Sequence, residues 1–306
     1  MATKGAARRP ARGRAALAAA VVLALAAGCQ AGSSAPPPEA TPDRPALTDP
    51  ARAATSAPAP ADPRVLLAVR SYRSYLQEQA AALPVRTGPF TDAVRAGDVP
   101  GARKRFPASR VCWERIQWVA AFLPDLDRRI DARAEGFAGP ADPAWTGWHR
   151  LEHTLWTRDS TTGAAPLADR LDRDLESLRQ AVPRLRITPV IMATGITRLV
   201  EEALETKVPG AEDRYSGTDL ADLAANLEGA EAAYGFARPV VAGRDPALAR
   251  LLDREFAAVG LVVGRYRAAA GYRPYPALSP ADGMLLRSRL GVLAESLSRL
   301  SAVFAR

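Results

Sequence analysis

Cysteine and histidine are almost absent from this sequence. The 306 residues include two cysteines, Cys29 and Cys112, and two histidines. Cys29 falls at the end of a leader-like segment, so Cys112 alone remains for the folded part, which excludes a disulfide framework and a thiolate metal site there. Cys112 lies in the apolar and aromatic stretch VCWERIQW. This setting predicts a buried, unreactive thiol.

Long apolar runs are also missing. The run from Ala15 to Ala27 has 13 residues, fewer than the ~20 needed for a membrane-spanning helix. Four arginines precede it, and it ends in LAAGC, which predicts an export signal over residues 1–28. The ending resembles the lipobox of bacterial lipoproteins and predicts lipidation of Cys29. The alternative is ordinary secretion, with cleavage after small residues.

Most of the excess positive charge lies in the leader. The chain has 41 basic and 33 acidic residues, but five basic residues and no acidic ones lie in residues 1–28. The remainder therefore has 36 basic and 33 acidic residues. Basic stripes interleaved with aromatic residues are not found, so nucleic-acid binding is not indicated.

Apolar periodicity is absent from residues 29–63, which contain eight prolines between residues 31 and 60. Such a segment buries too little surface to offset its conformational entropy, so it predicts a disordered tether. We expect this lipid-anchored linker to hold a folded domain, residues 64–306, away from a membrane.

Strand-like alternation is nearly absent from residues 64–306, whereas helical spacing is frequent. Leu171, Leu175 and Leu178 lie at positions i, i+4 and i+7, and similar spacings recur toward the C-terminus. Prolines and glycines predict helix breaks, among them Pro84 to Pro89, Pro107 and Pro239 to Gly243. The pattern predicts an all-α domain of about eight to ten helices, which two bundles sharing long helices would accommodate.

Both histidines lie in GWHRLEHTLW, residues 147–156. On a helix His149 and Glu152 share one face, and His153 lies one residue further. Three interpretations are open: histidines packed at a helix seam, a non-catalytic metal site completed by other helices, or a zinc peptidase. H-x-x-E-H spells a peptidase signature, but that class belongs to larger α/β chains. Nitrogen and oxygen ligands without sulfur suit iron, manganese or zinc.

Carboxylates occur on other predicted helices. CWERIQW presents Glu114 beside Gln117, and RRIDARAE presents Asp131 beside Glu135. RLVEEALETK presents three more, Glu201, Glu202 and Glu205. Each group alone is explained by a solvated helix face, and the sequence does not establish that they converge.

Several segments resemble the imelysin-like domain of EfeO and EfeM iron-uptake proteins. WTGWHRLEHTLW resembles its G-x-H-x-x-E motif, and DLDRRIDARAE resembles its D-L-D-x-x-I-D-A-R stretch. TKVPGAEDRYSGTDLADLAANLEGAE resembles T-K-I-x-G-E-E-x-R-Y-S-H-T-D-L-x-D-F-x-A-N-x-x-G-A. The likeness runs in order over roughly residues 65–300. It implies a double four-helix bundle with a metal-binding cleft, whose ligands would be His149, Glu152, Glu114, Asp131 and Glu202.

Departures from the family pattern concern the charge of this cleft. Gln117 stands where the family usually has a second glutamate, and Ala121 and Gly217 replace an acidic residue and a histidine. Gln117 and His153 are additional candidate ligands for the metal. A less anionic cleft is expected to hold trivalent metal less tightly.

The resemblance also implies a function. The tether leaves no room for the N-terminal cupredoxin domain of EfeO-type proteins, so the chain resembles the single-domain EfeM-like form. We expect an exported protein, lipid-anchored to the outer face of the cytoplasmic membrane, that binds iron and delivers it to a membrane permease. A haem peroxidase would be a further partner. The alternatives are an imelysin-type peptidase and an interaction protein whose metal site has degenerated.

Overall fold

The computed structural model describes residues 62–305. The expected signal peptide, the lipidation site Cys29 and the linker as far as residue 61 lie outside the described residues. The first helix, α1, begins at Pro63, and the Asp62 side chain caps it by accepting a hydrogen bond from the Arg64 backbone N–H at 2.9 Å.

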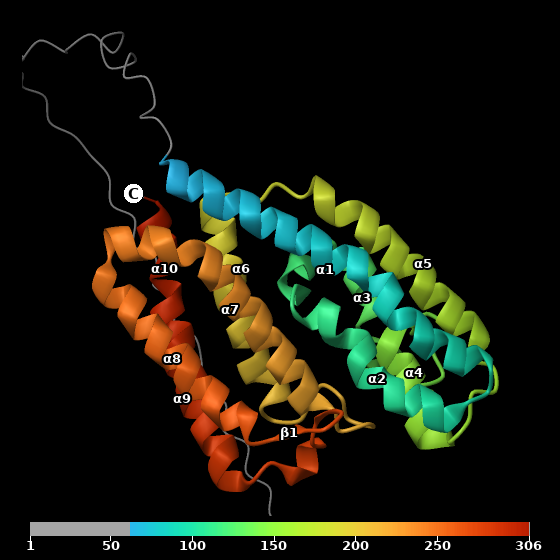
Figure 1. Ribbon diagram of the computed structural model, residues 1–306. Helices are drawn as coiled ribbons and strands as arrows, with labels where there is room; N and C mark the ends of the chain where they lie inside the picture. The colour runs from blue at the N-terminus through green and yellow to red at the C-terminus, as the bar shows by residue number, and fades with distance from the viewer. Residues whose placement is uncertain (1–61, 306) are drawn as a thin grey trace, which may run out of the picture. The chain divides into compact units, whose positions relative to one another are not determined.

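The described chain is almost entirely helical (Figure 1). The helices are α1 (Pro63–Arg95), α2 (Val99–Glu114), α3 (Pro124–Ile130), α4 (Gly147–Arg158), α5 (Ala165–Ala181), α6 (Pro189–Glu202), α7 (Asp219–Arg244), α8 (Pro246–Gly264), α9 (Pro280–Ser298) and α10 (Leu300–Phe304). Short 3-10 turns are η2 (Gln117–Phe122), η3 (Ala134–Gly136), η4 (Val182–Arg184) and η6 (Tyr275–Ala277), and η5 (Ala203–Lys207) is a π-helical turn. Within residues 62–305 the only strands are β1 (Arg267–Ala268) and β2 (Gly271–Tyr272), which pair antiparallel.

The helices form two four-helix bundles. In the first, α1 packs on α2 and α5, and α4 contacts both α2 and α5. In the second, α6, α7, α8 and α9 contact one another in a ring. The bundles meet where α7 packs against α1 and α2 (Figure 1). The predicted all-α double-bundle fold is therefore confirmed.

Proline explains several helix starts and contradicts several predicted breaks. Five helices, α1, α3, α6, α8 and α9, begin with proline, where the missing N–H costs no helical hydrogen bond. However, Pro84 and Pro89 lie inside α1, Pro107 inside α2 and Pro239 inside α7. The breaks predicted there are wrong. An internal proline costs about 3 kcal/mol, and burial of leucine and aromatic side chains along these helices offsets that cost.

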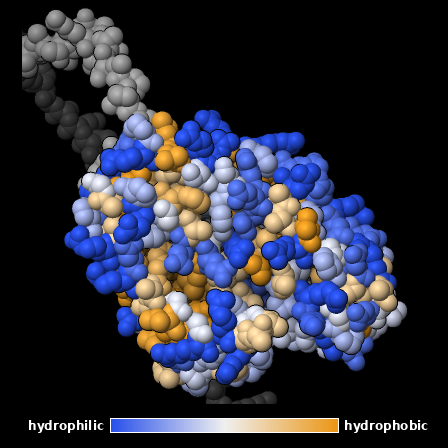
Figure 2. Space-filling view, in the orientation of Figure 1, coloured by the Kyte–Doolittle hydropathy of each residue, from blue (hydrophilic) through white to orange (hydrophobic). Residues whose placement is uncertain are grey.

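Apolar side chains from both bundles form one buried cluster. On the face shown in Figure 2, hydrophilic residues predominate and apolar ones are scattered among them. None of the helices within residues 62–305 combines the length and the apolar character needed to cross a bilayer.

Candidate functional site

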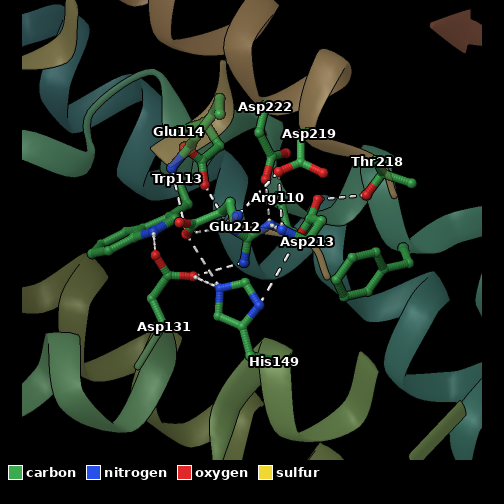
Figure 3. A network of polar contacts seen from close by, with 12 residues as sticks. Arg110, Trp113, Glu114, Asp131, His149, Glu212, Asp213, Thr218, Asp219 and Asp222 are labelled. Atoms are coloured by element: carbon green, nitrogen blue, oxygen red, sulfur yellow. Dashed lines mark hydrogen bonds and ion pairs between the residues drawn. The ribbon is translucent and has the colours of Figure 1, made fainter. Parts of the chain in front are cut away.

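A fully buried arginine on α2 lies at the centre of a charged site where the two bundles meet (Figure 3). Arg110 Nη1 donates to Asp131 at 2.6 Å, and Nη2 donates to Glu114 at 2.6 Å. Its Nε donates to Asp222 of α7 at 2.8 Å. Removing an arginine from water is costly unless each nitrogen has a partner. These three short contacts therefore fix Arg110 and tie the first bundle to the second.

Glycine at the start of α4 brings His149 close to Asp131. Gly147 has φ +83°, and a Cβ there would lie 2.2 Å from the carbonyl oxygen of Ile130, the last residue of α3. Only glycine allows this approach. Asp131 follows directly, and the indole N–H of Trp113 donates to its Oδ2 at 2.8 Å. The end of α3 and the start of α4 are thus held together. The side chains of Asp131 and His149 point to the interface between the two bundles, which we call the seam.

The segment between η5 and α7 supplies two further carboxylates, Glu212 and Asp213. Asp219, at the start of α7, accepts hydrogen bonds from both of their backbone N–H groups, at 3.0 and 3.2 Å. Gly217 has φ +66° and its carbonyl accepts from the Tyr275 N–H at 2.7 Å. Glycine adopts this left-handed conformation without steric cost. The turn aims Glu212 and Asp213 at His149 (Figure 3).

His149 is fully enclosed by carboxylates. Its Nδ1 lies 3.1 Å from Glu152 Oε2 and 3.8 Å from Asp213 Oδ1. Its Nε2 lies 3.3 Å from Glu212 Oε1 and 3.5 Å from Asp131 Oδ1. Burial and the Arg110 charge lower the pKa of the imidazole, but hydrogen bonds to Glu152 and Glu212 and the Asp131 charge outweigh them and raise the pKa to about 10. With no metal ion bound, the ring is therefore an imidazolium at neutral pH.

Glu152 is held in place by the turn that carries Glu212. Its Oε1 accepts from the backbone N–H groups of Tyr215 at 3.0 Å and Ser216 at 2.7 Å. One carboxylate oxygen is thereby used for positioning, and the other faces His149 Nδ1. This arrangement orients the imidazole, as carboxylates commonly do behind a metal-binding histidine.

Lys207, the last residue of η5, is the second fully buried cation. Its Nζ lies 3.3 Å from Glu114 Oε2 and 3.4 Å from Glu212 Oε1. Burial raises the pKa of Glu114 to about 7, although Lys207 and Arg110 act against this shift. For Glu212, burial acts upward too, but the charges of Lys207 and His149 dominate and hold the pKa well below its usual range. Glu212 is therefore the anion that the buried cations share.

Two groups of side chains offer three ligand atoms close enough for one metal ion: Asp131, His149 and Glu212 in one, and His149, Glu152 and Asp213 in the other. All of these residues are buried. A cavity of about 370 Å³ reaches the first group, because Asp131 and Glu212 belong to its lining. Asp127 lines the same cavity, where burial and the nearby charges of Asp131 and Glu202 raise its pKa to about 7. An imidazole with several carboxylates suits a hard or borderline cation.

The sequence-predicted candidates divide into three places. His149, Glu152, Asp131 and Glu114 meet in the seam. Glu202 lines the cavity, 3.8 Å from Lys207 Nζ, with about a third of its side chain exposed. Gln117 donates to Asp131 Oδ2 at 3.0 Å and also lines the cavity. His153 lies apart, with its ring packed between Trp145 and Tyr215 at centroid distances of 5.5 and 5.0 Å.

Six residues of the site were missed by sequence reasoning: Arg110, Lys207, Glu212, Asp213, Asp219 and Asp222. A buried arginine or lysine is rare enough that the sequence alone favours an exposed position. Glu212 and Asp213 lie in a turn without periodicity. A usable signal for Lys207 and Glu212 was their place within the segment resembling T-K-I-x-G-E-E.

The fold and the site together define a class: an all-α double bundle that encloses a histidine–carboxylate cluster at its seam. A model of the imelysin family matches residues 68–300, so the chain belongs to the imelysin family. The iron uptake system component EfeO of Yersinia pestis is 38% identical over 259 residues, which cover 84% of this chain and 69% of that protein. EfeO of Escherichia coli O157:H7 is 35% identical over 237 residues, covering 77% of this chain and 63% of that protein.

Proposed function

We propose that this protein is an iron-binding component of an Efe-type uptake system, which captures iron outside the cytoplasm and delivers it to a membrane permease. The observation that supports this most directly is the buried cluster of His149 with Asp131 and Glu212, reached from a cavity. The similarity to EfeO proteins, which are named as iron uptake components, supports the choice of iron. Iron is the cargo in this proposal.

The ligand atoms we assign are His149 Nε2 and one oxygen each of Asp131 and Glu212. Asp131 and Glu212 line the cavity, and His149 Nε2 lies 3.5 and 3.3 Å from their oxygens, whereas Nδ1 faces Glu152, which two backbone N–H groups already position. The Nδ1–H would then donate to Glu152, which sets the tautomer that leaves Nε2 for the cation. Glu114 and Glu202, which both lie near Lys207, are candidates for a further carboxylate ligand to the metal.

The location and partners follow from the same proposal. Residues 1–28 would be a lipoprotein signal peptide, Cys29 the lipidated residue, residues 29–63 a tether and residues 64–306 the imelysin domain. The protein would then work at the outer face of the cytoplasmic membrane. Its partners would be the iron permease and a haem peroxidase of the same system. Radiolabelled palmitate incorporation that is lost in Cys29→Ala tests the anchor.

Calorimetric titration with ferrous iron, manganese and zinc tests the site. We expect binding of one ion and at least about a hundredfold weaker binding for His149→Ala, because a ligand is removed. Glu152→Gln, which removes an orienting partner, is expected to lose about 10- to 100-fold. Glu201→Gln, at a half-buried residue that pairs with Arg198 and belongs to neither ligand group, is the control and should bind as the unmodified protein does. Unchanged affinity in His149→Ala would refute the site.

A peptidase is the alternative that the H-x-x-E-H pattern raised. It requires both histidines on one ion, with the glutamate as base. Among the described residues, His153 belongs to neither ligand group, so the non-catalytic function is favoured. Metal-dependent cleavage of a peptide library that is lost in Glu152→Gln would instead support the peptidase. Failure to take up metal at micromolar concentration would support an interaction protein with a degenerate site.

A further inference from the structure

Lys207 is surrounded by oxygen atoms at the edge of the candidate site. Four side chains place an oxygen within 4 Å of its Nζ, and we call them the Lys207 cage: Glu114 at 3.3 Å, Gln117 at 3.4 Å, Glu212 at 3.4 Å and Glu202 at 3.8 Å. Carboxylate and amide oxygens around a single positive charge are also what a hard metal cation prefers. The cage is therefore a cation-binding arrangement whose cation is supplied by the protein.

The two buried cations of the site are held very differently. Arg110 donates to three carboxylates at 2.6 to 2.8 Å, and its planar group fits them in a fixed geometry. Every contact of the Lys207 ammonium with its cage is 3.3 Å or longer. An ammonium on a flexible four-carbon chain can change partners, whereas a paired guanidinium cannot without losing several hydrogen bonds. Lys207 is thus the more loosely paired of the two cations.

The residues around Lys207 offer its ammonium a second position, beside the cavity. It ends a π-helical turn, a feature that occurs often at functional sites. Three members of the cage, Gln117, Glu202 and Glu212, also line the cavity. The side chain of Glu202 is 36% exposed, whereas Glu114 and Glu212 are 0% and 3% exposed. An ammonium leaving Glu114 and Glu212 can therefore move toward Glu202 and the cavity while remaining paired.

We propose that Lys207 is an exchangeable internal cation: an incoming metal ion displaces its ammonium from Glu212 and Glu114, which then become available to the metal. This inference rests on the proposed function, since it concerns the same cargo. Glu212 Oε1 is the pivot, because it lies 3.4 Å from Lys207 Nζ and 3.3 Å from His149 Nε2. Capture of the cargo is then a cation exchange, and Lys207 sets how strongly the site competes for metal.

Two substitutions with opposite consequences test the exchange. Lys207→Met keeps the length of the side chain and removes the competing charge, so we expect ferrous iron and manganese to bind at least about tenfold more tightly. Lys207→Arg keeps the charge in a form that pairs with two carboxylates at once, so we expect at least about tenfold weaker binding. Lys104→Met, at the other lysine within residues 62–305, is the control. A lysine with a purely structural role would weaken binding in both variants and overturn the proposal.

A second measurement uses the unmodified lysine, in case Lys207→Met does not fold. The chain has only three lysines, Lys4, Lys104 and Lys207, so acetylation by a water-soluble reagent can be followed residue by residue by mass spectrometry. We expect saturating manganese to speed acetylation of Lys207 at least about fivefold, because the ammonium moves to the cavity. Acetylation of Lys104 should not change. Equal or slower acetylation of Lys207 in the metal-bound protein would overturn the exchange.

The outcomes separate this inference from the proposed function. If the unmodified protein binds metal and Lys207→Met binds no more tightly, the exchange is wrong and the function stands. If only Lys207→Met binds metal, the exchange is supported, and the unmodified protein is not an iron carrier under those conditions. If neither binds, both proposals fail.

Discussion

Seven carboxylates and three basic side chains are buried together at the seam of the bundles. They are Glu114, Asp131, Glu152, Glu212, Asp213, Asp219 and Asp222, with Arg110, His149 and Lys207. Three carboxylate oxygens of this set, one each on Asp213, Asp219 and Asp222, accept no hydrogen bond from the described residues. At the scale of the residue, acidic groups therefore outnumber basic ones. Burial raises the pKa of Glu114 to about 7 and the pKa of Asp222 well above its usual range, so protons offset part of this excess and an added cation would take their place.

Gln117→Glu tests this balance at one residue. Gln117 donates to Asp131 Oδ2 at 3.0 Å, and glutamate would replace this donor with a negative charge. We expect metal binding about tenfold tighter in calorimetric titration, and a metal-free protein less stable by about 1–3 kcal/mol, since a buried hydrogen bond becomes a repulsive contact. Gln180→Glu is a matched control, because Gln180 also donates to a carboxylate, Glu176 at 2.8 Å, on exposed α5. It should leave metal affinity unchanged, and weaker binding in Gln117→Glu would contradict the prediction.

Cys112 supports a prediction about reactivity. The residue is 3% exposed, which confirms the burial predicted from VCWERIQW, and burial raises the pKa of the thiol. Both effects suppress the thiolate that attacks disulfide reagents. In a Cys29→Ser protein, we expect Cys112 to react at least roughly a hundredfold more slowly in the native state than in guanidinium, since reaction requires local opening. Fast, complete labelling of the native protein would contradict this.

Part of the site was predictable from residue spacing, and part was not. His149 and Glu152 share a helix face at i and i+3, a local property, and the structure puts them 3.1 Å apart. The convergence of Asp131 and Glu114 was implied only by the family resemblance. Asp213 was not predictable, since its direction depends on the bonds to Asp219 and on a turn held by Tyr275. Such contacts between distant segments leave no periodic signal.

At the scale of the element, the site depends on how closely α4 and α3 approach. Helix type and the apolar faces were predictable because they follow a 3.6-residue period. The sequence pattern predicts breaks at the internal prolines of α1, α2 and α7, which makes these helices too short. Packing of the buried faces outweighed this local signal. The junction at Gly147 fixes the distance between Asp131 and His149 and is open to a direct test.

Gly147→Ala should separate these elements. The added Cβ meets the Ile130 carbonyl oxygen at 2.2 Å at a positive φ, so we expect destabilisation of about 2–4 kcal/mol from backbone strain and overpacking. Denaturant unfolding measures the change. Gly291→Ala, within α9, has nothing within 4 Å of the new Cβ and should stabilise by about 0.5–1 kcal/mol. Equal effects of the two substitutions would show that the close approach of Gly147 to Ile130 does not contribute to the free energy of unfolding.

At the scale of the whole described domain, the candidate ligands come from both bundles. His149 and Asp131 belong to the first, and Glu212 lies on the segment that leads into α7 of the second. Arg110 already joins the two through Asp131 and Asp222. Bound metal would add a further connection at the same seam, so its effect on stability should extend to the complete domain.

Metal should therefore raise the melting temperature of the domain in a single transition. At a free concentration of about 100 times Kd, binding adds about 2.7 kcal/mol. For a domain of this size the expected shift is about 5–10 °C, measured by circular dichroism. His149→Ala should show no shift. Two transitions, of which metal moves only one, would mean that the ion is held within a single bundle.

The chain crosses between the bundles once, through the few residues from η4 to the start of α6. Because the candidate ligands lie on either side of this single crossing, their spacing depends on how the two halves pack. Under the proposed function, a displacement of one half by little more than the length of a coordinate bond would part His149 from Glu212, so packing at the seam and affinity for the ion are set together.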